Sequence, residues 1–332
     1  MKIVKLFPRE NGKYHFGEHT LESTSLIFSS DSLFSAIVNN YRKLYPEDVE
    51  GDVENLRNLR LSSVFPAYRD ILFIPKPMTK LGFRKDQEKE IRERSKDIKK
   101  IDFISLKALD EHNKEKLDID NIIDKQFLIT GDERDLFKEN KQQNLFVEIT
   151  EEKIAIDRTK GITSKGDLFV VSYIKPRNGT YFYFLIGDDK IESSIKKKLY
   201  VSIRLIADEG LGGERSSGAG LFDEIRIEDD AIFGNYTFDS DHRMSLSLVF
   251  PKDEREFRSS ESYQLIERRG YICFMKGTGL RKKGILMMKE GSIFKGDVDG
   301  KVVDVSPNNE YDVYRFGRFF GIPIRYVEDD AQ

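Results

Sequence analysis

Eleven residues at 210–220, GLGGERSSGAG, combine five glycines with one arginine and two serines. Glycine permits sharp turns and positive φ angles, and without a side chain it lets a ligand approach the main chain closely. Successive N–H groups in such a loop can form a concave anion site, to which a guanidinium adds a bidentate phosphate contact. The residues predicted to hold a phosphate backbone are Gly210, Gly212, Gly213, Arg215, Ser216, Ser217, Gly218 and Gly220.

The common phosphate-binding motifs do not explain this loop. A P-loop requires GxxxxGK[ST], and no Lys-Ser or Lys-Thr pair follows these glycines. A dinucleotide fingerprint requires a strand before the glycines and a helix after them. Here residues 191–208 have helical apolar spacing and 221–228 alternate like a strand. The order is therefore helix, loop, strand, and an ordinary connection rich in turn residues is the alternative explanation.

A predicted hairpin at 151–175 is the second candidate site. Its strands are expected near 153–156 and 168–173, and its tip is basic while its root is apolar. Such an element can displace a base from its stack while cations hold the flanking phosphates. An ordinary exposed hairpin is the alternative. The tip residues predicted to contact RNA are Asp157, Arg158, Lys160 and Lys165.

Serines also mark the start of a predicted helix that ends near Leu44. Ser30 or Asp31 is expected to cap this helix. The free N–H groups and the dipole at a helix start can receive a phosphate. We therefore add Ser30 and Ser32 to the predicted RNA contacts, although Asp31 would oppose a phosphate if its carboxylate pointed inward.

The composition limits the class of protein. The chain has 332 residues, enough for two domains, and 34% of them are charged. Its net charge of −3 is not that of a free nucleic-acid binder, so any RNA contact must come from a local patch. The single cysteine, Cys273, excludes an internal disulfide and a cysteine-based zinc site. No signal peptide or membrane span is evident, and a cytoplasmic location is expected.

The predicted elements that position these sites occur in a recognisable order. They are a strand at 1–8, the helix ending near Leu44, short strands in 61–77, the hairpin, a strand at 180–187, a helix at 191–208 and a strand at 221–228. This order matches a split βαβ arrangement with an insertion. We predict the α+β class, with two ferredoxin-like (RRM-type) domains in series. The first domain covers 1–238 and the second covers 239–332. The first contains an insertion at about 47–150, in which the charged segment 83–107 is expected to form a solvated helix, with an interaction arm as the alternative.

Four segments, taken in order, resemble a known family. They are FSSDSLFSAIVNNYRKLY, IAIDRTKGITSKGDLFVVSYI, GLGGERSSGAGLF and VYRFGRFFGIPI. Together they resemble the Csm4 family of type III-A CRISPR effector complexes, Cas5-like members of the RAMP group. The glycine-rich loop alone would indicate only the RAMP group, whereas EGSIF and VYRFG favour Csm4 over its type III-B counterpart, Cmr3. The resemblance spans about residues 1–325 but gives no support within 83–146.

The resemblance implies a non-catalytic RNA-binding subunit. Members of the family hold the 5′ repeat-derived tag of the CRISPR RNA (crRNA), cap a filament of Csm3 subunits and dock the large Cas10 subunit, Csm1. They also present a β-hairpin thumb that displaces a base near the start of the guide. By position, 151–175 would be the thumb and 210–220 would contact the tag. The implied partners are therefore crRNA, a Csm3-type subunit and a Cas10/Csm1-type subunit, without a membrane.

The alternative is an endoribonuclease resembling the Cas6 group of RAMP proteins, which commonly use a histidine as general acid or base. The chain has four histidines, of which His15 and His19 would share a face if they lay in a strand. Two ligands without an obvious third make a weak metal site. No HD dipeptide or GGDD-like sequence is present. We predict no catalytic residue, no metal and no cofactor, and keep the Cas6-like nuclease as the alternative.

Overall fold

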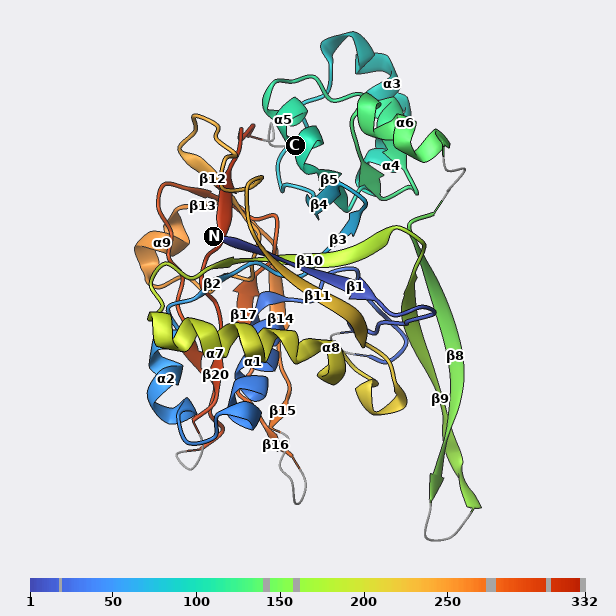
Figure 1. Cartoon of the computed structure of the whole chain (residues 1–332). Coiled ribbons are helices and arrows are strands. Elements are labelled where there is room, and N and C mark those ends of the chain that lie inside the picture. Colours follow the sequence, from blue (N-terminus) through green and yellow to red (C-terminus); the bar gives the residue numbers. More distant parts are fainter. Residues whose placement is uncertain (18–19, 140–143, 158–161, 273–278, 309–311, 329–332) are drawn as a thin grey trace.

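The computed structural model describes the chain except for residues 18–19, 140–143, 158–161, 273–278, 309–311 and 329–332. The fold mixes helices and strands throughout, as predicted for the α+β class (Figure 1). Within the described residues, no helix has the length and apolar character needed to cross a membrane.

A nine-stranded sheet forms the centre of the molecule. Its first four strands, in spatial order and all antiparallel, are β11 (Phe222–Asp229), β1 (Lys2–Pro8), β10 (Thr180–Gly187) and β3 (Phe65–Tyr68), and β2 (Arg60–Leu61) also pairs with β10. Side chains of β10 alternate between two cores, with Phe182 and Phe184 in one and Tyr181 and Tyr183 in the other. This alternation is the pattern of a strand that is buried on both faces.

Helices cover one face of this sheet (Figure 1). They are α1 (Ser30–Leu44), α2 (Val49–Leu56), α7 (Ser193–Arg204) and α8 (Ile206–Glu209). Ile37 of α1 and Leu199 of α7 are fully buried in the same core. The predicted helix ending near Leu44 and the predicted strands β1, β10 and β11 are confirmed, and the helix predicted at 191–208 is present as α7 followed by the short α8. The predicted cap is wrong: the helix begins at Ser30 itself, and Ser29 occupies the N-cap position.

The insertion continues the sheet beyond β3 and forms the upper part of Figure 1. Its elements are β4 (Ile71–Pro75), η1 (Lys85–Gln87), α3 (Glu88–Glu93), α4 (Ser95–Lys99), β5 (Phe103–Ser105), α5 (Leu106–Asn113), η2 (Ile119–Asn121), β6 (Ile122–Ile123), β7 (Phe127–Leu128) and α6 (Gly131–Glu139). The insertion is narrower than the predicted 47–150, because β2 and β3 pair with β10. The charged segment 83–107 forms short helical pieces and a strand instead of one helix.

His112 of α5 joins the insertion to the C-terminal segment. Its ring is fully buried, and its Nδ1 accepts a hydrogen bond of 2.9 Å from the amide of Gly82. Nε2 therefore carries the proton and donates to the carbonyl oxygen of Arg325 at 3.1 Å. Burial lowers the pKa of His112 to about 4, so the folded protein holds the neutral ring. Both ring nitrogens of His112 are therefore used in hydrogen bonds that hold the fold together.

We expect acid to weaken the fold through His112. The unfolded chain binds a proton near pH 6.5, whereas the folded chain does so only near 4, so stability falls as the pH drops between these values. Between pH 7 and 5 the wild type should lose about 2 kcal/mol more than His112→Gln, which cannot titrate. Urea unfolding at both pH values measures this difference. Equal losses of stability in the wild type and in His112→Gln would contradict the lowered pKa assigned to His112.

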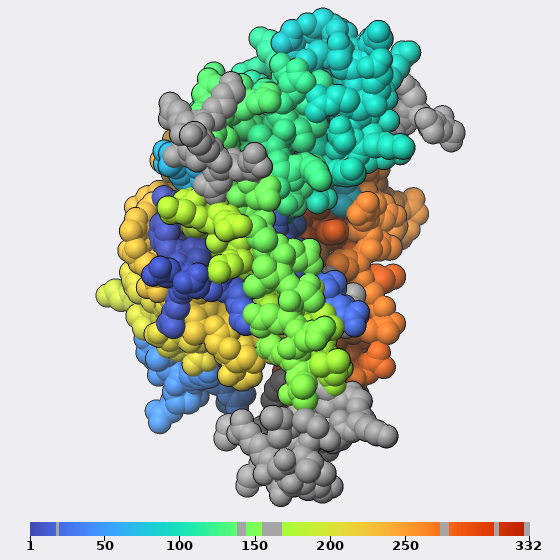
Figure 2. Space-filling view, turned by 90° about the vertical axis from the view of Figure 1, so that its right-hand side faces the viewer, coloured from blue at the N-terminus to red at the C-terminus, as the bar shows by residue number. Residues whose placement is uncertain are grey.

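A long antiparallel hairpin projects from the body beside the sheet (Figure 1). It consists of β8 (Phe146–Asp157) and β9 (Ile162–Pro176), so both strands are longer than predicted. Figure 2 shows the hairpin, in green, running down one face of the molecule beneath the insertion. Its root is fixed by the pairing of Ile174 with Tyr14, in the segment that follows β1.

The C-terminal half packs against the other face of the central sheet. Its own antiparallel sheet has the spatial order β13 (Ser260–Ser262), β18 (Ile293–Lys295), β12 (His242–Ser245) and β21 (Gly321–Pro323), with α9 (Glu254–Arg258) after β12. Three two-stranded pairs complete it: β14 (Leu265–Arg268) with β17 (Ile285–Met288), β15 (Tyr271–Ile272) with β16 (Leu280–Arg281), and β19 (Val303–Asp304) with β20 (Tyr314–Arg315). Met244 and Ile322 share a core with Ile3 and Tyr183.

Candidate nucleic-acid interface

The glycine-rich loop folds back on itself and on the segment that follows β1. Gly220 has φ +79°, and an added Cβ there would lie 2.1 Å from the carbonyl oxygen of Leu211. At Gly212, with φ +90°, an added Cβ would lie 2.3 Å from the carbonyl oxygen of His15. Backbone packing therefore requires glycine at both positions, for a reason other than ligand approach.

Several amides of the loop are already used inside the protein. Gly213 donates to the carbonyl oxygen of His15 at 2.9 Å, and Gly220 donates to that of Lys13 at 2.8 Å. The amide of Gly210 bonds to Ile206. The predicted anion site built from successive glycine amides is therefore not formed by these three glycines. What the loop exposes is its tip, which contains the short 3₁₀ turn η3 (Arg215–Ser217) and Gly218.

Alanine substitutions at two glycines of the loop distinguish the effect of close packing from that of backbone strain. Gly220→Ala and Gly218→Ala both place alanine at positive φ, but only the first also meets a backbone atom, because Gly218 faces open space. We expect Gly220→Ala to lower the free energy of unfolding by about 1–3 kcal/mol more than Gly218→Ala. Urea titration of both variants measures this difference. Equal destabilisation would mean that the loop relaxes away from Leu211.

A cleft of about 900 Å³ lies between α1, the loop and the C-terminal half. Its described lining includes basic side chains from all three parts and no carboxylate. The basic residues are Arg42, Lys43, Arg215, Arg268, Arg269, Lys282 and Arg315. In a chain of net charge −3, this cleft is the local positive patch that RNA binding would require.

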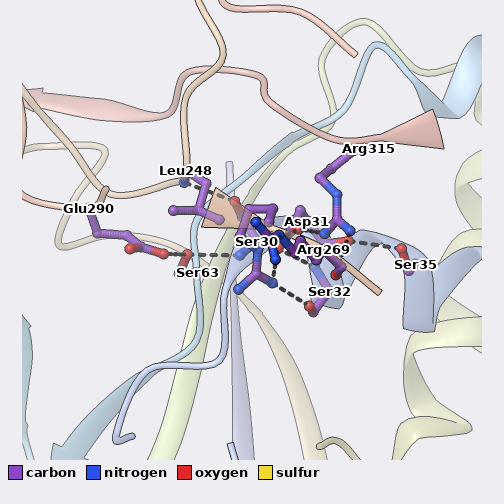
Figure 3. A network of polar contacts seen from close by, with 10 residues as sticks. Ser30, Asp31, Ser32, Ser35, Ser63, Leu248, Arg269, Glu290 and Arg315 are labelled. Carbon is purple, nitrogen blue, oxygen red and sulfur yellow. Dashed lines mark hydrogen bonds and ion pairs between the residues drawn. The ribbon is translucent and has the colours of Figure 1, made fainter. Parts of the chain in front are cut away.

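A buried ion-pair network forms the floor of the cleft (Figure 3). Asp31 is 1% exposed, and Arg268 donates to its two carboxylate oxygens at 3.0 and 2.8 Å. Arg315 also donates to Asp31 and, at 3.1 Å, to the carbonyl oxygen of Arg269. Burial opposes ionisation of Asp31, but the attraction of both guanidinium groups outweighs it and lowers its pKa. The carboxylate is thus ionised and paired, and does not oppose a phosphate in the cleft.

Ser30 and Ser32 have different surroundings. Ser30 is fully buried, its hydroxyl accepts a bond from the amide of Leu248 at 3.0 Å, and its amide donates to the Ser63 hydroxyl (Figure 3). Ser63 in turn donates to the buried carboxylate of Glu290. Ser30 therefore joins the two halves of the protein and has no access to RNA, whereas Ser32 lines the cleft.

The hairpin and the loop are in direct contact. Lys153 Nζ lies 2.6 Å from Glu214 Oε2, and this hydrogen bond lowers the pKa of Glu214. Val171 and Tyr173 of the hairpin pack with Ala219 of the loop. The two predicted sites are thus one connected unit. Of the predicted tip residues, Arg158 and Lys160 lie outside the described residues, as do the side chains of Asp157 and Lys165.

The candidate catalytic histidines do not form a site in the described structure. His15 lies outside the strands and is 4% exposed, with Nδ1 2.8 Å from the carbonyl oxygen of Ser172. It packs directly beneath the glycine loop, because an added Cβ at Gly213 would meet its ring at 2.7 Å. His19 and Cys273 lie outside the described residues. Over the described part of the chain, no three His, Cys, Asp or Glu side chains are grouped to hold a metal ion.

Sequence reasoning missed most of the cations that the cleft brings together. Arg42 and Lys43 lie in the last turn of α1, and Arg268, the last residue of β14, is followed by Arg269 in the motif ERRG. The paired basic residues were the available signal, but nothing local indicates that they face the loop. Three further basic residues are consecutive in the sequence at 281–283, and of these only Lys282 lines the cleft.

Comparison with known proteins identifies the family. A sequence model of the RAMP superfamily matches residues 14–223, and one of the CRISPR Csm4 C-terminal domain matches residues 238–324. A protein of Methanocaldococcus jannaschii named CRISPR system Cms protein Csm4 is 39% identical, over 94% of this chain and 90% of its own length. The chain belongs to the Csm4 family. A Csm4 relative from Streptococcus thermophilus is 28% identical over 88% of this chain and 89% of its own length.

Solved structures resemble this Csm4-family chain over its whole length. A chain in the crystal structure of the Csm3–Csm4 subcomplex of the type III-A CRISPR-Cas interference complex has a TM-score of 0.74 and 33% identity, covering 98% of this chain and all of that one. A chain in the crystal structure of a Csm1–Csm4 cassette with cA4 has a TM-score of 0.64, covering 99% of both chains. At 18% identity, the second similarity shows the fold alone.

Proposed function

We propose that this Csm4-family chain is a non-catalytic, crRNA-binding subunit of a type III-A (Csm) interference complex. In this role it holds the 5′ tag of the crRNA and links a Csm3-type backbone to a Cas10/Csm1-type large subunit. The observation that carries the proposal is the cleft in which seven cations from three distant parts of the chain converge. The similar structures, a Csm3–Csm4 subcomplex and a Csm1–Csm4 cassette, support the two protein partners.

We infer that both halves are ferredoxin-like domains. Numbered along the chain within each half, the four antiparallel strands have the spatial order 4-1-3-2 in β11-β1-β10-β3 and again in β21-β12-β18-β13. This is the order expected for a split βαβ fold. Among the described residues between β18 and β21 there is no counterpart of α7, the second helix of the split βαβ order. The match of the Csm4 C-terminal domain from residue 238 supports a boundary at 238/239.

The RNA contacts we propose are those that the cleft and the loop tip expose. The residues are Ser32, Arg42, Lys43, Gly212, Arg215, Ser216, Ser217, Gly218, Arg269 and Lys282. Gly210, Gly213 and Gly220 shape the loop. The β8–β9 hairpin is the proposed thumb, and the Lys153–Glu214 pair supports it by joining the hairpin to the loop.

Binding and cleavage of labelled crRNA test this function together. The purified chain, with and without a Csm3-type partner, is incubated with crRNA that carries or lacks the 5′ tag. We expect tag-dependent binding that the partner strengthens, with the RNA left intact. Specific cleavage by the chain alone, persisting in chelator and lost in a His15→Ala/His19→Ala variant, would instead make it a Cas6-like nuclease.

A further inference from the structure

Tyr271 on the β15–β16 hairpin exposes its aromatic ring to solvent. The residue is 65% exposed. Other surface rings have internal partners: Tyr263 contacts Phe257 with centroids 6.0 Å apart, and the Arg57 guanidinium lies 3.7 Å from the Tyr314 centroid. No such contact is recorded for Tyr271 with any described residue. One exposed aromatic residue is ordinary by itself, so its position decides what it means.

Tyr271 lies on the hairpin that borders the basic cleft, between Arg269 and Lys282, which both line it. In the hairpin it pairs directly with Arg281. Lys282, the next residue, lines the cleft, and its amide donates to the carbonyl oxygen of Gly270 at 2.9 Å. The hairpin is anchored to the cleft floor, because Arg315 donates to the carbonyl oxygen of Arg269 at 3.1 Å. The hairpin therefore holds the ring opposite Arg281 and close along the chain to two residues that line the cleft.

We propose that Tyr271 is a stacking platform for an unpaired base of the RNA strand whose phosphates occupy the cleft. This inference rests on the proposed function. Unpaired bases in protein-bound RNA stack on aromatic side chains while neighbouring cations hold the backbone. The flat ring, its direct partner Arg281 and the adjacent Lys282 supply both parts of this arrangement. Because every base has a π-face, the contact accepts any base.

Affinity measurements test the platform by separating stacking from charge. Tyr271→Ala should weaken binding of tagged RNA about tenfold, while Tyr271→Phe retains wild-type affinity. The slope of log affinity against log salt should stay unchanged, because no cation is lost. Tyr263→Ala is the matched control, since Tyr263 is also exposed but borders a different cavity, together with Ser262 and Gln264. Wild-type affinity in Tyr271→Ala would overturn the proposal.

Fluorescence gives an independent readout, because the chain has no tryptophan. Tyr271→Trp introduces a single indole, whose emission should be quenched when a base stacks on it, whereas the emission of Tyr263→Trp should not change. An unquenched Tyr271→Trp that still binds RNA would overturn the platform while leaving the proposed function intact. Failure of the wild type to bind tagged RNA would contradict the proposed function itself. Weaker partner-subunit binding by Tyr271→Ala, with unchanged RNA affinity, would assign the ring to a protein contact.

Discussion

Asp31→Ala is expected to lower the free energy of unfolding by about 3–5 kcal/mol. The substitution removes the carboxylate that pairs with both Arg268 and Arg315, whose side chains are 9% exposed. Two guanidinium groups would then remain buried side by side without that counter-charge. Because Asp31 belongs to α1 and both arginines to the C-terminal half, the loss should also loosen the contact between the halves. Urea unfolding at neutral pH measures the effect.

An exposed ion pair provides the control for Asp31. Asp229 pairs with Lys2 at 2.6 Å, but its side chain is 89% exposed. Asp229→Ala should therefore change the free energy of unfolding far less than Asp31→Ala does, because solvent and salt screen an exposed ion pair. Asp31→Asn keeps the shape but not the charge, and should fall closer to Asp31→Ala than to the wild type. If Asp31→Ala is no less stable than Asp229→Ala, the network does not hold the two halves together.

Reversing three charges in the cleft is expected to reduce tagged-RNA affinity by on the order of 100-fold. The substitutions are Arg42→Glu, Arg215→Glu and Lys282→Glu, one from each part of the protein that forms the cleft. All three avoid the buried network at the floor, so the fold should persist. Loss of three phosphate contacts should also reduce the salt slope by about 2. Filter binding across a salt series measures both quantities.

A matched charge change far from the cleft is the control for this triple variant. Lys89→Glu, Arg92→Glu and Lys96→Glu alter net charge by the same amount on the exposed helices α3 and α4 of the insertion. This control should bind RNA nearly as well as the wild type. If both triple variants lose affinity equally, only the overall charge attracts RNA and the cleft has no special role.

Sequence patterns predicted the elements whose side chains alternate over many residues. The strand β10 and the helices α1 and α7 each have enough residues for their period to be seen. The strands within residues 108–150 were not predicted, because β6 and β7 have only two residues each. Strands of this length contain no alternation, and tertiary packing determines where they form.

The cleft was beyond prediction because its parts are distant in the sequence. Arg268 and Arg315 follow Asp31 by 237 and 284 residues, and no local pattern links them. The loop itself was found from its composition, but the packing role of some of its glycines was not. Close contact with Leu211 and His15 requires glycine at 220 and 212, and this contact becomes visible only in three dimensions.

Photocrosslinking of the tag tests the central claim most directly. The crRNA carries 4-thiouridine at successive positions of its 5′ tag. It is bound to the chain together with a Csm3-type partner and irradiated. The crosslinked peptides are then identified by mass spectrometry. We predict crosslinks to peptides that contain the loop tip at 215–218, the end of α1 near Arg42, and the segment 268–282. Crosslinks confined to other peptides, such as those of α3 and α4 in the insertion, would show that the tag does not bind in the cleft.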